Sequence, residues 1–265
     1  MAERSQHHGA HRPLLEVNTE PVEPALSRTV RLLNALIRPL TKRDWQDQHK
    51  VPKSGGVIFV INHISNADPL AVGQFLAFSG RWPRFLAKSS LFGVPVLGWL
   101  LRACGQIPVQ RRSPAAADAL AAAVSAVEAG RAVIVYPEGT ITRDPELWPM
   151  AGKTGAARIC LQTGCQVIPI GQWGAQEIMY GTKIGFPKLI PRKTLHLKVG
   201  DPVELDDLRG KPVTSAVLTE ATDRIMDEIT ALVADLRGGI PPERYDPRAR
   251  LDGPPAQEQP WRVCG

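Results

Sequence analysis

Short apolar runs and helix-like segments alternate along the chain from residue 55 to residue 237. The apolar runs are rich in Val and Ile, which is typical of buried strands, whereas the helix-like segments repeat apolar residues three and four positions apart. We expect strands at 57–61, 84–87, 107–110, 132–136, 167–172 and 194–199, and helices at 69–78, 94–103, 113–130, 154–163 and 214–236. This alternation predicts an α/β fold: a single domain with a mixed, mostly parallel sheet flanked by helices.

The segment at 25–50, which precedes the sheet, has a different pattern. Its apolar residues recur every three or four positions from Leu26 to Leu40, and its basic residues fall on the opposite face, namely Arg28, Arg31, Arg38 and Lys42. This pattern predicts an N-terminal basic amphipathic helix that lies in a membrane interface. The alternative is a helix packed on the domain with a solvated basic face.

The two ends of the chain lack such periodicity. Residues 1–24 are polar, and residues 238–265 are rich in Pro, Arg and Asp. We expect a disordered N-terminus and a flexible C-terminal tail, which leaves 51–237 as the folded domain.

Composition and charge narrow the classes of partner. The formal net charge is +6, and residues 25–53 alone contain seven basic and two acidic side chains. Such a cluster favours lipid head groups or phosphate, and the lack of interleaved aromatics and of any known motif argues against nucleic acid. No apolar run is long enough to span a membrane or to form a secretory signal. The four cysteines lack metal-ligand spacing, so we expect reduced thiols in a cytosolic chain and no metal site.

The most informative polar residues directly follow the run 57–61. His63 is followed five residues later by Asp68, which can fold back within one turn and orient the imidazole. An imidazole held in this way at the end of a strand is a candidate general base. The alternative is structural, since Asp68 before Pro69 is also a good helix N-cap.

Three further segments also lie at the ends of expected strands. Gly105-Gln-Ile-Pro-Val-Gln-Arg111 presents an arginine, the side chain best matched to a phosphate, although a solvated basic pair is the simpler interpretation. Tyr136-Pro-Glu-Gly-Thr140 would place Glu138 and Thr140 in the same crevice as His63, or form only a turn. The run 167–170 contains a proline that marks an edge or a bend.

In this order the four segments resemble the glycerolipid acyltransferases, whose pattern is Asn-His-x4-Asp, Gly-x-Ile-x-Val-x-Arg, Phe/Tyr-Pro-Glu-Gly-Thr and an apolar stretch with Pro. The resemblance covers roughly residues 50–200, and the joint occurrence is far more specific than any single motif. It implies that His63 is the base and Asp68 its partner. It further implies that a phosphorylated acceptor is held by six residues: Lys88, Arg111, Glu138, Gly139, Thr140 and Arg143. After Thr140 the chain departs from the family pattern, because Ile141 and Thr142 precede Arg143.

The resemblance also implies a reaction. An acyl group would move from acyl-CoA or acyl-carrier protein to the free hydroxyl of 1-acyl-glycerol 3-phosphate, giving phosphatidic acid with no resident cofactor. Backbone N–H groups near Gly139 would stabilise the oxyanion. The acceptor is an amphiphile, so the enzyme would work on an anionic membrane surface, peripheral or monotopic at the cytoplasmic face of the cell membrane. The apolar run 91–101 suits that surface, or forms an ordinary core helix. Rival functions are acylation of glycerol 3-phosphate or another lysophospholipid, thioester hydrolysis, and lipid binding without catalysis.

Overall fold

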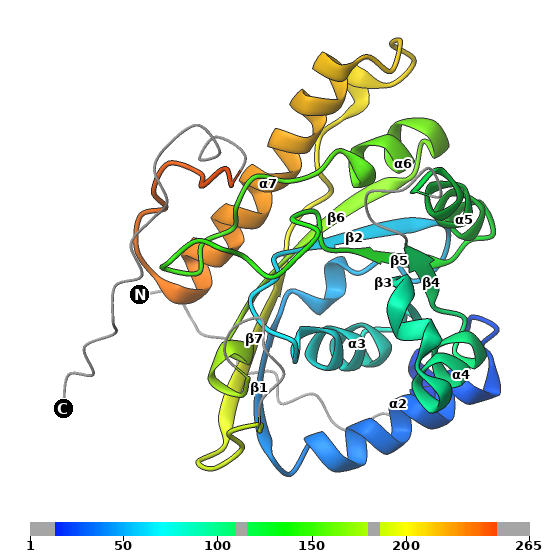
Figure 1. Ribbon diagram of the computed structural model, residues 1–265, viewed down its shortest axis with the longest axis vertical. Coiled ribbons are helices and arrows are strands. Elements are labelled where there is room, and N and C mark those ends of the chain that lie inside the picture. The colour runs from blue at the N-terminus through cyan, green and yellow to red at the C-terminus, as the bar shows by residue number, and fades with distance from the viewer. Residues whose placement is uncertain (1–13, 110–115, 180–185, 248–265) are drawn as a thin grey trace.

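A seven-stranded sheet forms the centre of the computed structural model, which describes residues 14–109, 116–179 and 186–247. The strand order is β1-β7-β6-β2-β5-β3-β4 (Figure 1). All neighbours are parallel except β6 and β7, which are antiparallel, so the expected mixed, mostly parallel sheet is confirmed. The strands are β1 (Thr41–Gln46), β2 (Val57–Ile61), β3 (Pro83–Lys88), β4 (Ile107–Val109), β5 (Ala132–Val135), β6 (Gln166–Trp173) and β7 (Lys193–Val199).

Helices cover both faces of the sheet, as Figure 1 shows. One face packs against α5 (Ala116–Glu128), α6 (Gly155–Thr163) and α7 (Ser215–Arg237), and the other against α3 (Asp68–Phe78). Because both faces are covered, every residue of β2 and β5 is buried, which explains why these strands are continuous apolar runs. The expected start of the α5 helix at residue 113 and the end of a strand at residue 110 lie outside the described residues.

The N-terminal part of the chain differs from the sequence-based predictions. The short helix α1 (Leu14–Val17) and the helix α2 (Pro24–Ile37) pack through Leu14, Leu26 and Val30 against residues near α3 and α4 (Pro95–Ala103). The prediction of disorder for residues 1–24 is therefore wrong for 14–24, and residues 1–13 lie outside the described part. The predicted helical segment 25–50 is also wrong beyond residue 37, since β1 pairs with β7 at the edge of the sheet.

Helices α2 and α4 are apolar on part of their exposed surface. Leu32 and Leu36 of α2 are 62% and 56% exposed, and Val96 and Trp99 of α4 are 79% and 65% exposed. The run 91–101 is therefore not an ordinary core helix. Among the described residues no helix combines the length and the apolar character that crossing a membrane would require.

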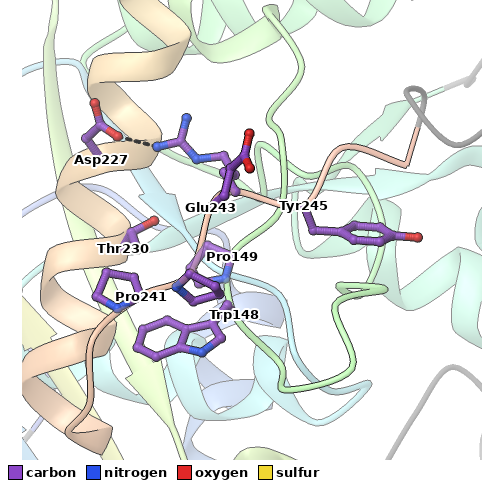
Figure 2. A pocket seen from close by; sticks show the side chains of 9 residues that line it. Trp148, Pro149, Asp227, Thr230, Pro241, Glu243 and Tyr245 are labelled. Atoms are coloured by element: carbon purple, nitrogen blue, oxygen red, sulfur yellow. Dashed lines mark hydrogen bonds and ion pairs between the residues drawn. The ribbon is translucent and has the colours of Figure 1, made fainter.

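The segment after α7, residues 238–247, is here called the C-terminal strap. It folds back along α7 and lines, together with Trp148, Pro149 and residues of α7, an open pocket of about 330 Å³ (Figure 2). Its Arg244 forms ion pairs with Asp223 and Asp227 of α7. The prediction of a flexible tail from residue 238 is therefore wrong for the strap, and residues 248–265 lie outside the described part.

Candidate active site

Three parallel neighbours, β2, β5 and β3, end at the same edge of the sheet. His63 follows β2, Tyr136 follows β5, and Lys88 is the last residue of β3. Open α/β sheets bind ligands outside the carboxyl ends of their strands. The edge therefore gathers residues from segments that are far apart in the sequence.

The imidazole of His63 is held by a buried carboxylate. Its Nδ1 lies 2.8 Å from Oδ2 of Asp68, and the two side chains are 15% and 0% exposed. The same carboxylate oxygen accepts hydrogen bonds from the backbone N–H groups of Ile64 at 2.7 Å and Ser65 at 2.9 Å. Because this oxygen is an acceptor, it favours the tautomer of His63 in which Nδ1 carries the proton and donates it to Asp68. Nε2 is then the unprotonated, basic nitrogen of the ring.

This geometry separates the two interpretations of Asp68. Asp68 is the first residue of α3, and its carboxylate points back to residues 63–65 and not toward the helix. The backbone N–H groups of Leu70 and Ala71 in the first helical turn donate instead to the carbonyl of Ala67. The N-cap interpretation is therefore wrong. Burial raises the pKa of Asp68, and the hydrogen bonds that it accepts from His63 and from the two backbone N–H groups oppose that rise.

The carboxylate of Glu138 binds the protein backbone. Its Oε1 accepts the N–H of His63 at 2.8 Å, its Oε2 accepts the N–H of Met150 at 3.1 Å, and the residue is 1% exposed. The carbonyl of His63 accepts the N–H of Thr142 at 2.7 Å. Glu138 was expected to hold the acceptor, but its oxygens are occupied and shielded, so that expectation is corrected: Glu138 fixes the backbone of the base.

The turn after β5 requires a glycine. Gly139 has a positive φ of 71°, and a Cβ there would lie 2.8 Å from Nζ of Lys153. Lys153 therefore lies over this turn, at the same edge as His63, and is a cation that the sequence-based predictions did not include. The N–H of Gly139 donates to the carbonyl of Tyr136 at 2.9 Å, so this N–H does not serve as the expected oxyanion donor.

The remaining candidates for acceptor binding differ in exposure. Lys88 and Arg143 are exposed and Thr140 is partly exposed, so all three are accessible to a soluble head group. Arg111 lies outside the described residues. The substrate-binding role of these four residues stays a prediction.

Two other residues of the first motif are structural. The side-chain amide of Asn62 exchanges two hydrogen bonds with the backbone of Gln172 and ties β2 to β6. The hydroxyl of Ser65 donates to the carbonyl of Met179 at 2.7 Å, and the residue is fully buried. Ser65 is therefore not available as a nucleophile.

An aromatic ring that the sequence-based predictions did not include lies on the imidazole. The rings of His63 and Tyr136 are stacked with centroids 4.3 Å apart and an interplanar angle of 21°. The phenol oxygen of Tyr136 is buried, and within the described part of the chain it has no hydrogen-bond partner. The aromatic first position of the Tyr136–Thr140 motif was the signal that could have pointed to it.

Comparison with known proteins gives a consistent result. A family model described as Acyltransferase matches residues 42–173. A chloroplast 1-acyl-sn-glycerol-3-phosphate acyltransferase of Brassica napus is 34% identical over 145 residues, which cover 54% of this chain and 40% of that protein. A 1-acyl-sn-glycerol-3-phosphate acyltransferase of Borreliella burgdorferi is 34% identical over 122 residues, which cover 45% and 46%. The chain belongs to the glycerolipid acyltransferase family.

The acyltransferase fold extends over most of the chain. The crystal structure of the 1-acyl-sn-glycerophosphate acyltransferase PlsC from Thermotoga maritima superposes with a TM-score of 0.62 at 21% identity, covering 82% of this chain and 81% of that one. In sequence, by contrast, this chain spans less than half the length of the two relatives named above.

The stack predicts a specific response to changes at Tyr136. Tyr136→Phe keeps the ring and removes only an unpaired buried hydroxyl, so we expect kcat and thermal stability close to those of the parent protein. Tyr136→Leu removes the aromatic face that stabilises the imidazolium cation, which is worth about 0.5–2 kcal/mol, or about 2- to 30-fold in kcat. Steady-state kinetics of both variants test this. Equal kcat values for Phe and Leu at this position would contradict it.

The buried carboxyl group of Glu138 predicts that the stability of the protein depends on pH. Burial raises the pKa of Glu138 from 4.5 to about 8, although its backbone hydrogen bonds oppose the rise. Between these two values the folded protein binds a proton that the unfolded chain has released, so stability falls as the pH rises. In Glu138→Gln the melting temperature should depend less on pH between about 5 and about 8 than it does in the parent protein. An unchanged slope in that variant would disprove the assignment.

Proposed function

We propose that this protein transfers a fatty acyl group from a thioester to the free hydroxyl of 1-acyl-glycerol 3-phosphate, forming phosphatidic acid. The observation that carries the proposal is the imidazole of His63, held through Nδ1 by the buried Asp68 at 2.8 Å. The names of the relatives, which are 1-acyl-sn-glycerol-3-phosphate acyltransferases, support this choice of substrate.

In the proposed reaction Nε2 of His63 takes the proton of the acceptor hydroxyl. At the same time the hydroxyl oxygen of the acceptor attacks the carbonyl carbon of the thioester. The new C–O bond forms and the C–S bond then breaks. The thiolate leaves and takes the proton back from the imidazolium, so the enzyme returns to its starting state. Asp68 keeps the tautomer and stabilises the imidazolium, whose charge arises only during the reaction.

The acceptor phosphate is proposed to lie among the basic side chains at the carboxyl edge of the sheet. Lys88 and Arg143 are exposed there, Lys153 lies over Gly139, and Thr140 adds a hydroxyl. Arg111 is included as a further phosphate ligand on the ground of its sequence motif alone. Charge-assisted hydrogen bonds to phosphate are strong and directional, which would fix the glycerol hydroxyl relative to His63. The thiol carrier, CoA or acyl-carrier protein, is left open in this proposal.

We further propose that α2 and α4 face the membrane. Their exposed apolar residues, among them Leu32, Leu36, Val96 and Trp99, would enter the interface, and Arg28 and Arg31 would contact anionic head groups at the cytoplasmic face. Val96→Asp with Trp99→Asp should release the protein from anionic vesicles in a sedimentation assay. Val213→Asp is the control, because Val213 is also exposed but precedes α7. Undiminished vesicle binding of the double variant would place the contact elsewhere.

The acceptor is tested by offering one acyl-CoA and a mixed pool of acceptors to the purified protein. Mass spectrometry should detect phosphatidic acid as the main product, and about 10²–10⁴-fold less of it per unit time with His63→Ala. One relative, the lyso-ornithine lipid O-acyltransferase of Pseudomonas aeruginosa, is 26% identical over 114 residues, so the pool includes lyso-ornithine lipid. If the protein prefers that acceptor or glycerol 3-phosphate, the proposed acceptor is wrong. Release of free fatty acid without acceptor would indicate a hydrolase.

A further inference from the structure

The backbone of the candidate base is fastened to one loop, residues 141–151, here called the Trp148 loop. Thr142 at its beginning donates its N–H to the carbonyl of His63 at 2.7 Å. Met150 at its end donates its N–H to Glu138, the same carboxylate that accepts the N–H of His63. A shift of this loop would therefore move both peptide groups that flank the imidazole.

The loop has internal support but also a strained residue. The hydroxyl of Thr142 donates to the carbonyl of Trp148 at 2.7 Å, and the carboxylate of Asp144 accepts the N–H of Trp148 at 3.1 Å. Leu147 has a φ of 63°, a left-handed conformation that costs a residue with a Cβ about 1–2 kcal/mol. Such a conformation persists only where the surroundings fix it, so the loop depends on contacts from outside.

The first outside contact comes from the end of α7. The guanidinium of Arg237 lies between two indoles, 4.2 Å from the ring centroid of Trp148 and 4.4 Å from that of Trp173. It also donates to the carbonyl of Glu146 at 2.6 Å. Arg237 thereby joins the Trp148 loop to the end of β6, and its planar shape suits a place between two flat rings.

The second outside contact is the C-terminal strap. The N–H of Ala151, next to Met150, donates to the carbonyl of Tyr245 at 2.9 Å. Arg244 holds the strap on α7 through Asp223 and Asp227, and the strap lies beside Trp148 and Pro149 in Figure 2. Both outside contacts come from residues beyond the region 42–173 that the family model matches.

We infer that Arg237 and the C-terminal strap are positioning elements for His63, which they hold through the Trp148 loop and Glu138. The inference rests on the proposed function for its kinetic consequence, but its structural consequence does not depend on the reaction. Catalytic geometry is sensitive at this scale, since a displacement of about 1 Å can cost about 10²-fold in rate.

The test compares substitutions on α7 in the full chain. Arg237→Ala should lower kcat about 10- to 100-fold with little change in the KM for acyl-CoA or acceptor, because the chemical step and not substrate binding is disturbed. Arg237→Lys keeps the charge but loses the planar stack, so its kcat should be intermediate. Arg224→Ala is the matched control, since Arg224 lies on the same helix and binds the exposed Asp207 and Glu220 and the carbonyl of Glu204, none of which belongs to the Trp148 loop.

Amide hydrogen exchange gives a readout that needs no catalysis. The amides of His63, Thr142 and Met150 should exchange faster in Arg237→Ala and in Arg244→Ala, and at the parent rate in Arg224→Ala. Unchanged exchange at these three amides would overturn the inference even if the protein is an active acyltransferase. Faster exchange in a protein that lacks acyl transfer altogether would leave the positioning role in place and reject the proposed function.

Discussion

Replacing His63 with alanine is expected to lower kcat for acyl transfer by about 10²–10⁴-fold, the usual contribution of a general base. Nε2 of His63 is the basic nitrogen at the edge of the sheet, and the imidazole is fixed by Asp68 and by the ring of Tyr136. Folding should be little affected, because Asp68 keeps its hydrogen bonds from Ile64 and Ser65. Initial rates of thiol release, measured with a melting curve of the same sample, separate the two effects. Turnover close to that of the parent protein would remove His63 from the mechanism.

Replacing Asp68 with asparagine is expected to have a second large effect, a fall in kcat of about 10²–10⁴-fold. The amide oxygen can take the place of Oδ2 and keep the backbone hydrogen bonds, but it carries no charge to stabilise an imidazolium. If the amide turns round, its NH2 group faces the N–H groups of Ile64 and Ser65, and the loop that carries His63 is disturbed. Either outcome slows the reaction.

The chain contains a matched control for this substitution. His196 and Asp44 form a second pair of the same kind, with Nδ1 and Oδ2 also 2.8 Å apart, but on β7 and the edge strand β1, where the two side chains are partly exposed. Asp44→Asn removes an equivalent hydrogen-bond partner from a histidine far from the candidate site in the strand order. We expect its kcat to stay within about twofold of the parent value, since this pair lies on strands that carry no residue of the candidate site. Equal losses in the two variants would mean that the effect at Asp68 is not catalytic.

The central strands and the His63–Asp68 pair could be predicted because their signals are local. β2 and β5 are continuous apolar runs, and five residues of one turn are enough to bring a carboxylate back to an imidazole. β1 was missed because its residues are polar apart from Trp45 and only Thr41 is buried, so neither alternation nor an apolar run marks it as a strand. Its pairing depends on β7, about 150 residues later in the chain.

The role of Glu138 could not be predicted for a related reason. Motif spacing places its carboxylate near the base, but the two backbone N–H groups that it accepts belong to His63 and Met150, and only the folded loops bring them together. The strap was missed because a segment rich in Pro and charge is typical of disorder, whereas Arg244 finds two carboxylates one helical turn apart on α7.

The polar character of β1 has a consequence for the behaviour of the protein in solution. An outermost strand has one row of backbone N–H and C=O groups that no neighbouring strand satisfies, which invites another chain to add to the sheet. Here that strand reads Thr-Lys-Arg-Asp-Trp-Gln, and three successive charged residues, Lys42 to Asp44, resist such pairing. The same charged residues that make β1 difficult to predict as a strand thus disfavour edge-to-edge pairing of sheets from different molecules.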